Sequence, residues 1–205
     1  MLENLHWLGH ASFLYEGRKR IYFDPWQLKA GAKPADLILI SHEHYDHLSP
    51  EDVAKVQTPN TVIVTAVDCA AKLTGNVITL KPGETTEVAG IRIEAVRAYN
   101  RNKPFHPMPK GWLGLVADID GFVIYHAGDT DHIPEMKGVK ADVALLPVGG
   151  TYTMTADEAA RATLDITHKI AIPMHYGSIV GSEKDARRFA SLVKRVEVRI
   201  MEAGK

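Results

Sequence analysis

The sequence predicts a mixed α/β fold in which two β-sheets are covered by outer helices. Apolar stretches of strand length recur along the chain and alternate with stretches that have the length and periodicity of amphipathic helices. At 205 residues and 45% hydrophobic content, the chain can bury a full core. No linker, low-complexity run, charge block or internal repeat divides the sequence, so residues 1–205 are expected to form a single domain.

The first half of the chain is expected to contain four strands and two helices. Its most apolar stretch, Leu-Ile-Leu-Ile at 37–40, has the length of a buried strand. Ser49 and Pro50 are typical of a helix start, with Ser49 as the cap and Pro50 in the first helical position. The expected strands are 21–24, 37–41, 61–65 and 77–80, and the expected helices are 50–56 and 67–72.

The second half is expected to contain five strands and two helices. Apolar and polar residues alternate along 91–98 with the two-residue period of a strand. Helices interleave with strands in both halves, and two sheets with outer helices account for this order better than one doubly wound sheet. The expected strands are 91–98, 114–119, 122–126, 143–146 and 170–174, and the expected helices are 155–165 and 183–195.

The seven residues that follow the apolar stretch 35–40 carry a concentration of metal-binding groups. The run Ser-His-Glu-His-Tyr-Asp-His at 41–47 places three imidazoles and the carboxylate of Asp46 in one strand-to-helix loop. Zinc and other first-row metals bind several such nitrogen and oxygen ligands at once. A purely structural role explains a lone histidine, but a cluster on a solvated face would repel itself when protonated. The run therefore predicts a metal site.

The spacing His42-x-His44-x-Asp46-His47 resembles the signature of the metallo-β-lactamase fold superfamily. Other pieces follow in the family's order: Asp24 at a strand end, His-Ala-Gly-Asp-Thr at 126–130, and Pro-Met-His-Tyr-Gly at 173–177. The resemblance covers nearly the whole chain and implies a four-layer αβ/βα sandwich with two divalent metal ions. By this resemblance the first metal is held by His42 and His44, the second by Asp46, His47 and His175, and both by Asp129.

One ligand of the family pattern is displaced in this sequence. The family usually has a further histidine at the end of a mid-chain strand, but here that strand runs into Tyr99 and Asn100, and the nearest histidine is His106. We expect His106 to complete the first metal site, because imidazole is a commoner transition-metal ligand than the amide of Asn100. The alternative makes His106 a substrate contact and leaves the first metal with fewer protein ligands.

Further residues are expected beside the metal ligands. Asp24 is expected to accept a hydrogen bond from a metal-bound histidine. His10 follows the first strand and is expected to orient a ligand, although a substrate contact or an ordinary turn histidine stays open. Substrate contacts are expected from Asn100, Arg101, Lys103 and Tyr152.

Composition limits the partners of the protein. The 24 basic and 25 acidic residues give a net charge of −1, so there is no broad basic surface for nucleic acid. A local basic loop of Arg101, Lys103 and Lys110 suits one small anionic substrate. Cys69 is the single cysteine, and no apolar run approaches the ~20 residues of a membrane span. We expect a cytoplasmic protein with a small-molecule substrate and without nucleic-acid or membrane partners; a homo-oligomer stays open.

The opening segment Trp-Leu-Gly-His-Ala-Ser-Phe at 7–13 is similar to a small single-domain branch of the superfamily, which includes ascorbate-phosphate lactonase-like proteins and Zn-dependent hydrolases. The resemblance implies a hydrolase that uses a metal-bound hydroxide on a small cytoplasmic ester, lactone or phosphodiester, with Asp46 or Asp129 moving the proton. Zinc is the expected metal, with manganese or iron as alternatives. Two other functions stay open: a mononuclear iron dioxygenase of glyoxalase-like type, and a non-catalytic metal- or ligand-binding protein.

Overall fold

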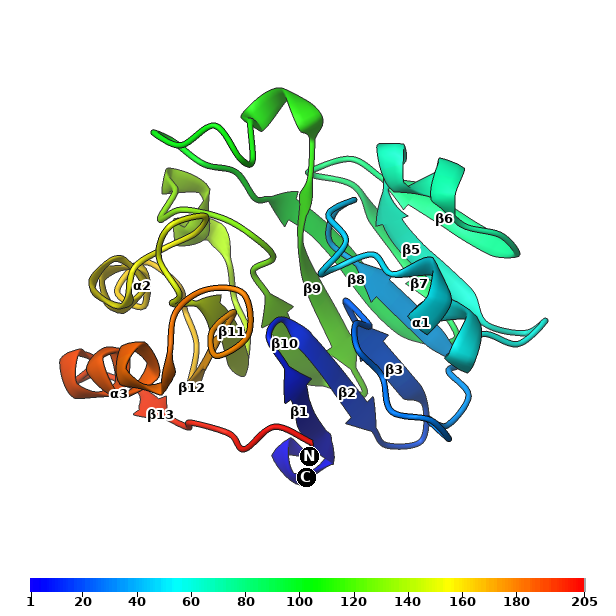
Figure 1. Ribbon diagram of the computed structural model, residues 1–205, viewed down its shortest axis with the longest axis horizontal. Coiled ribbons are helices and arrows are strands. Elements are labelled where there is room, and N and C mark those ends of the chain that lie inside the picture. Colours follow the sequence, from blue (N-terminus) through cyan, green and yellow to red (C-terminus); the bar gives the residue numbers. More distant parts are fainter. Residues whose placement is uncertain (205) are drawn as a thin grey trace.

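Two β-sheets form the centre of the protein, with helices on their outer sides (Figure 1). The computed structural model describes residues 1–204. The first sheet has the order β1-β2-β3-β4-β5-β6, antiparallel from β1 to β3 and parallel from β3 to β6. Its strands are β1 (Leu5–Gly9), β2 (Ser12–Glu16), β3 (Arg20–Phe23), β4 (Leu37–Ile40), β5 (Val62–Ala66) and β6 (Asn76–Leu80).

The second sheet comes from the C-terminal part of the chain and has the order β13-β12-β11-β10-β9-β8-β7. The pairs from β10 to β13 are parallel, and those from β7 to β10 are antiparallel. Its strands are β7 (Thr85–Val88), β8 (Ile91–Arg97), β9 (Leu113–Ile119), β10 (Phe122–His126), β11 (Val143–Pro147), β12 (Ile170–Met174) and β13 (Glu197–Val198).

The helices are short and begin at residues that the sequence marks clearly. Ser49 caps α1 (Pro50–Val56) by accepting a hydrogen bond from the backbone N–H of Asp52. Thr155 forms a capping box at the start of α2 (Ala156–Ala162), which packs against α3 (Glu183–Leu192). No helix in the described part of the chain has the length and apolar character needed to cross a membrane. The 3-10 helices are Leu2–Asn4, Val67–Lys72, Met108–Lys110 and Pro134–Gly138.

The mixed two-sheet fold predicted from the sequence is confirmed, but some of its elements differ from the prediction. Residues 67–72 form a 3-10 helix, and the helices expected at 155–165 and 183–195 end earlier, at Ala162 and Leu192. The strands β2, β7 and β13 were not predicted, and β1 was expected only as a strand before His10, without a residue range. β7 and β13 are sheet edges of mostly exposed or half-buried residues, so neither has a strong apolar pattern.

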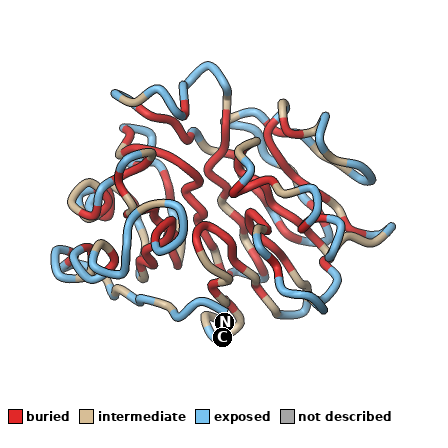
Figure 2. Tube along the Cα trace, in the orientation of Figure 1, coloured by how far each residue is buried: buried red, intermediate tan, exposed pale blue. Residues whose placement is uncertain are grey.

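The buried side chains of both sheets form one continuous hydrophobic cluster. Figure 2 shows buried residues along the strands and exposed residues on loops and outer helix faces. His126 lies inside this cluster, stacked on Phe23, and its Nε2 donates to the carbonyl of Ala11 at 2.8 Å. Its Nδ1 accepts from the backbone N–H of Gly128, which fixes this tautomer. His126 therefore ties the β1–β2 turn to the end of β10.

Strand direction gathers the candidate site residues at one rim. In the first sheet, β1 runs in the same direction as β3 and β4, because β2 is antiparallel to both of its neighbours. In the second sheet, β8 runs in the same direction as β10 and β12 for the same reason. The loops that follow these strands carry His10, Asp24, the 41–47 run, His106, Asp129 and His175.

Candidate metal centre

The rim holds two clusters of histidine and aspartate side chains whose ligand atoms lie within 4.8 Å of one another in each cluster. The first cluster consists of His42, His44 and His106 together with Asp129. The second cluster consists of His10, Asp46, His47 and His175. All except the half-buried His44 are buried. Each cluster has enough nitrogen and oxygen donors to hold one metal ion.

Asp129 lies between the two clusters. Its Oδ2 is 3.1 Å from Nε2 of His106 in the first cluster and 3.1 Å from Nε2 of His175 in the second. Its Oδ1 is 3.1 Å from Nε2 of His47. Burial alone would raise the pKa of Asp129, but the positive field of His175 and His47 outweighs it and holds the pKa well below its usual range. The carboxylate is therefore anionic and faces both clusters.

Neutral groups orient the first cluster. Nδ1 of His42 contacts the Ser41 hydroxyl at 2.9 Å, and Nδ1 of His106 contacts Oδ1 of Asn100 at 2.9 Å. Since the amide oxygen only accepts, Nδ1 of His106 donates to it, and Nε2 is the ring nitrogen that faces the cluster. Burial lowers the pKa of His42 and of His44, which favours the neutral imidazole that binds metal.

Asn100 therefore lies behind His106. Its Oδ1 also accepts from the backbone N–H of His106 at 3.0 Å, and its Nδ2 donates to Asp131 and to the carbonyl of Tyr152. These contacts use the amide oxygen that would otherwise bind a metal or substrate. The arrangement favours His106 over Asn100 as the candidate ligand.

Carboxylates orient the second cluster. Oδ2 of Asp24 accepts from Nδ1 of His47 at 2.6 Å and from the Ser41 hydroxyl at 2.6 Å, and Asp24 is fully buried. Oδ2 of Asp46 accepts from Nε2 of His10 at 2.9 Å. Burial alone would raise the pKa of Asp46, but the hydrogen bond from His10 and the field of His47 lower it to about 2. Asp24 and His10 thus lie where a support for the ligands is expected.

Backbone geometry at the rim is strained in a way that places these side chains. His10, Asp24 and His175 have positive φ angles of 52°, 43° and 59°, a conformation that costs non-glycine residues roughly 1–2 kcal/mol each. Gly128, just before Asp129, has a φ of 62°, and a Cβ there would lie 2.6 Å from the carbonyl of Leu113. Only glycine lets this turn approach the start of β9 so closely.

The donor set fits divalent metal ions. Several buried side-chain atoms at the centre have no hydrogen-bond partner among the described residues: Nδ1 of His10, Nε2 of His47, Nε2 of His106, both ring nitrogens of His175 and Oδ1 of Asp129. An unpartnered buried polar group costs about 1–3 kcal/mol, so a concentration of them at one point calls for a ligand. Imidazole nitrogens and carboxylate oxygens in this number are the ligands of zinc, manganese and iron.

A cavity of about 240 Å³ gives access to the centre. Its lining includes the predicted Tyr152, but not Asn100, Arg101 or Lys103. Lys103 instead donates to Asp131 and to the carbonyl of Thr153. Sequence reasoning missed the remaining non-ligand lining, which is Tyr45, Phe105 and Ile179.

The missed support residues carried weak signals. Ser41 opens the 41–47 run, but a serine has no intrinsic preference for a metal site. Trp112 is buried beside the imidazoles of His42 and His44, with ring centroids 4.8 and 4.7 Å away, and its Nε1 donates to Asp68. A larger cavity of about 340 Å³, lined by Leu8, Leu14 and other residues, contains no member of either cluster.

Comparisons with known proteins agree with this site. Residues 4–175 match the family model of the beta-lactamase superfamily domain. A UPF0173 metal-dependent hydrolase of Thermoplasma acidophilum is 37% identical over 217 residues, which cover 95% of this chain and 93% of the relative. A second one, from Thermococcus onnurineus, is 36% identical and covers 98% and 96%.

Solved structures extend the comparison. A metal-dependent hydrolase from Parabacteroides distasonis is 36% identical, with a TM-score of 0.87 over 97% of this chain and 92% of that one. A metallo hydrolase from Ignicoccus hospitalis is 26% identical, with a TM-score of 0.79 over 98% and 95%. The chain belongs to the metallo-β-lactamase superfamily and is one of its metal-dependent hydrolases.

Proposed function

We propose that the two clusters each hold one divalent metal ion and that the protein hydrolyses a small ester, lactone or phosphodiester. One observation carries the proposal: two clusters of ligand side chains, several of whose buried atoms have no hydrogen-bond partner among the described residues, meet at Asp129 and line a single cavity. His42, His44 and His106 are assigned to the first ion, Asp46, His47 and His175 to the second, and Asp129 to both. Zinc is the preferred ion, with manganese or iron as alternatives.

Two cations held there would supply Lewis acidity and lower the pKa of a bound water to about 7. The residues of the chain would position the substrate and carry the proton that is transferred. Hydrolysis adds water across the bond: the hydroxyl group goes to the acyl carbon or phosphorus, and a proton goes to the departing oxygen. Asp46 is the proposed proton carrier, because His10 contacts one of its oxygens while Asp129 is enclosed by three imidazoles.

Relatives of this chain are named hydrolases, which favours hydrolysis over the glyoxalase-like dioxygenase and the non-catalytic protein considered above. The cytoplasm remains the proposed location, because the single cysteine offers no internal disulfide that would suit an oxidising compartment.

Elemental analysis of protein purified without added metal tests the metal assignment. We expect about two zinc, manganese or iron ions per chain, and fewer after His47→Ala or Asp129→Asn. His6→Ala is the matched control, because His6 lies outside both clusters and should leave the metal content unchanged. A single ion per wild-type chain, or full retention in Asp129→Asn, would contradict the shared centre.

Activity of the metal-loaded protein tests the reaction. Phenyl acetate, γ-valerolactone and bis-p-nitrophenyl phosphate represent the three substrate classes, each assayed with zinc and with manganese. We expect turnover of at least one class and its loss on chelation. Failure on all three, with both ions bound, would refute the proposed substrate classes.

A further inference from the structure

The non-ligand walls of the cavity share one chemical character. The lining consists of five ligand candidates and four other residues, and all four of these are aromatic or aliphatic: Tyr45, Phe105, Tyr152 and Ile179. Each comes from a different loop, following β4, β8, β11 and β12 respectively. Four separate loops therefore direct large, largely apolar side chains at one cavity.

These walls are exposed to an unusual degree for such side chains. Tyr45 is 66% exposed, Phe105 40% and Ile179 39%, and they make up three of the nine large hydrophobic residues that are exposed in the described part of the chain. Exposed apolar side chains that gather at a cavity mark a binding surface, because scattered ones have no such focus.

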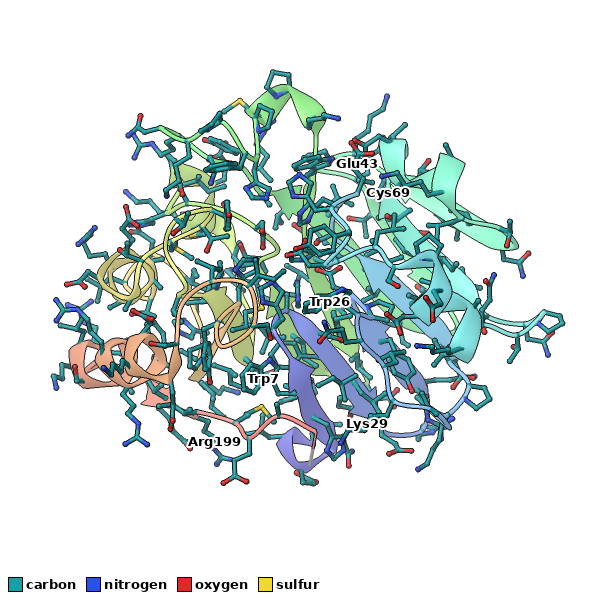
Figure 3. The ribbon with its side chains drawn as sticks, in the orientation of Figure 1. Trp7, Trp26, Lys29, Glu43, Cys69 and Arg199 are labelled. Carbon is teal, nitrogen blue, oxygen red and sulfur yellow. The ribbon has the colours of Figure 1, made fainter. Side chains whose placement is uncertain are left out.

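Aromatic contacts fix the walls in place. The rings of Phe105 and Tyr152 meet edge to face, with centroids 4.8 Å apart and planes at 83°. On the opposite loop, Tyr45 packs edge to face on Trp26, 6.2 Å between centroids; Trp26 is labelled in Figure 3. Such pairs stabilise the loops by about 0.5–1.5 kcal/mol beyond their burial, so the walls are preformed.

No lysine or arginine is part of the described lining, and the lysines around it are neutralised. Lys103 is paired with Asp131, while Lys110 and Lys72 are both paired with Glu43, which is labelled in Figure 3. Arg101 is exposed and is not part of the lining. The basic loop that the sequence offered for an anionic substrate thus leaves no free cation facing the cavity.

We propose that the cavity selects uncharged substrates that carry a compact alkyl or aryl group beside the hydrolysed bond. This inference rests on the proposed hydrolase function and sharpens its substrate class. The carbonyl faces the two clusters, and the apolar group fills the space between Phe105, Tyr152 and Ile179. A carboxylate in that group would lose its hydration against apolar walls with no cation to replace it.

A series of γ-lactones tests the selectivity, with side chains from methyl to hexyl and a hexyl analogue that ends in a carboxylate. We expect kcat/KM to rise about fourfold per methylene until the cavity is filled, the factor that corresponds to ~0.8 kcal/mol per buried methylene. The carboxylated lactone should be at least tenfold slower than the neutral lactone of the same length.

Two variants move the selectivity in opposite ways. Phe105→Ala should flatten the dependence on chain length, and Ile179→Lys should raise kcat/KM for the carboxylated lactone while lowering it for the neutral one. Leu164→Ala is the matched control, because Leu164 is an exposed leucine outside the cavity, and all rates should stay unchanged. A flat profile in the wild type, or a preference for the carboxylated lactone, would overturn the inference.

Matched γ-lactams separate this inference from the proposed function, since their binding is measured by calorimetry without turnover. Tighter binding with longer neutral side chains supports apolar selectivity even if no lactone is hydrolysed, an outcome that would refute only the lactone hydrolysis. Hydrolysis of γ-valerolactone together with lactam affinities that ignore chain length would refute the selectivity and leave the hydrolase function in place.

Discussion

The two clusters of the metal centre are supported in different ways. Behind the first cluster lie neutral groups, the Ser41 hydroxyl at His42 and the Asn100 amide at His106. The second cluster contains the carboxylate of Asp46 and is backed by the buried carboxylate of Asp24. Negative charge close to a dication strengthens binding far more in a buried site than in water. We therefore expect the second cluster to bind its ion more tightly and the first to exchange its ion more readily.

The two supports also differ in reach. Asp24 contacts His47 directly and reaches His42 through the Ser41 hydroxyl, so it serves both clusters. Asn100 contacts only His106 among the candidate ligands. We therefore expect the buried carboxylate of Asp24 to couple the two proposed ions and the amide of Asn100 to affect only one of them.

Removing a ligand from either cluster should have the largest effect on metal content and activity. Asp46→Ala should lose the ion of the second cluster and lower kcat by at least about 100-fold, more than the 10- to 100-fold typical of a supporting residue. His106→Ala should lose only the ion of the first cluster. Chelator titration with elemental analysis reads out both. Equal loss of both ions in each variant would show that the clusters do not bind independently.

Replacing a residue that orients a ligand should have a smaller effect, and the two metal-binding steps should be affected differently by the two replacements. Asp24→Asn should weaken both binding steps by about 10- to 100-fold, and Asn100→Ala should weaken only one of them by a similar factor. Stepwise metal titration of chelator-treated protein distinguishes the two patterns, and thermal unfolding of the same samples confirms that each variant is folded. A single weakened step in Asp24→Asn would disprove the coupling through Ser41.

Charge also holds the loop that follows Asp24. Asp52 accepts hydrogen bonds from the backbone N–H groups of Gln27 and Leu28 and pairs with Lys55. Burial alone would raise the pKa of Asp52, but Lys55, Ser49 and the two N–H groups outweigh it and lower the pKa from 3.8. The stabilisation is therefore present above about pH 4 and is lost as the pH falls through the lowered value.

Asp52→Asn should thus lower the free energy of unfolding by about 2 kcal/mol at neutral pH. Urea unfolding of wild type and variant at pH 7 and pH 3 measures the effect, and the difference between the two proteins should shrink at pH 3. The same difference at both pH values would show that packing, and not charge, holds the loop.

The smallest expected effect compares strain at the centre with strain at a distant turn. Ala89, in the turn between β7 and β8, has a positive φ of 54°, as His10 and His175 do at the rim. Ala89→Gly should raise the free energy of unfolding by about 1 kcal/mol without changing metal content, since no ligand depends on it. Thermal unfolding provides the measurement. Unchanged stability would mean that positive φ costs little in this fold.

Sequence reasoning succeeded where local pattern and function coincide. The 41–47 run follows a fully buried strand, so the position of its loop and the fold around it could be read together. His106 was the difficult case, because its place depends on a loop that folds back so that the backbone N–H of Asn100 donates to the carbonyl of His106 at 2.7 Å. The periodicity of apolar residues along the sequence does not predict that a loop folds back in this way.

Apart from Tyr152, the pocket walls could not be predicted, for a related reason. Tyr45, Phe105, Tyr152 and Ile179 meet only because four loops end at one rim. The pairing of Lys103 with Asp131 was equally hidden, since the two residues are 28 positions apart. Charge counted along the sequence suggested a free basic loop that the fold neutralises.

The division of the ligands between the two sheets has a consequence for the lifetime of the folded protein. His42, Asp46 and His47 lie on the loop that follows β4 of the first sheet, while Asp129 and His175 lie on loops that follow β10 and β12 of the second. An ion held between them would link segments more than half of the chain apart, and opening the sheets would require that link to break. We therefore expect metal supply to govern how long a molecule survives before unfolding, independently of how fast it turns over substrate.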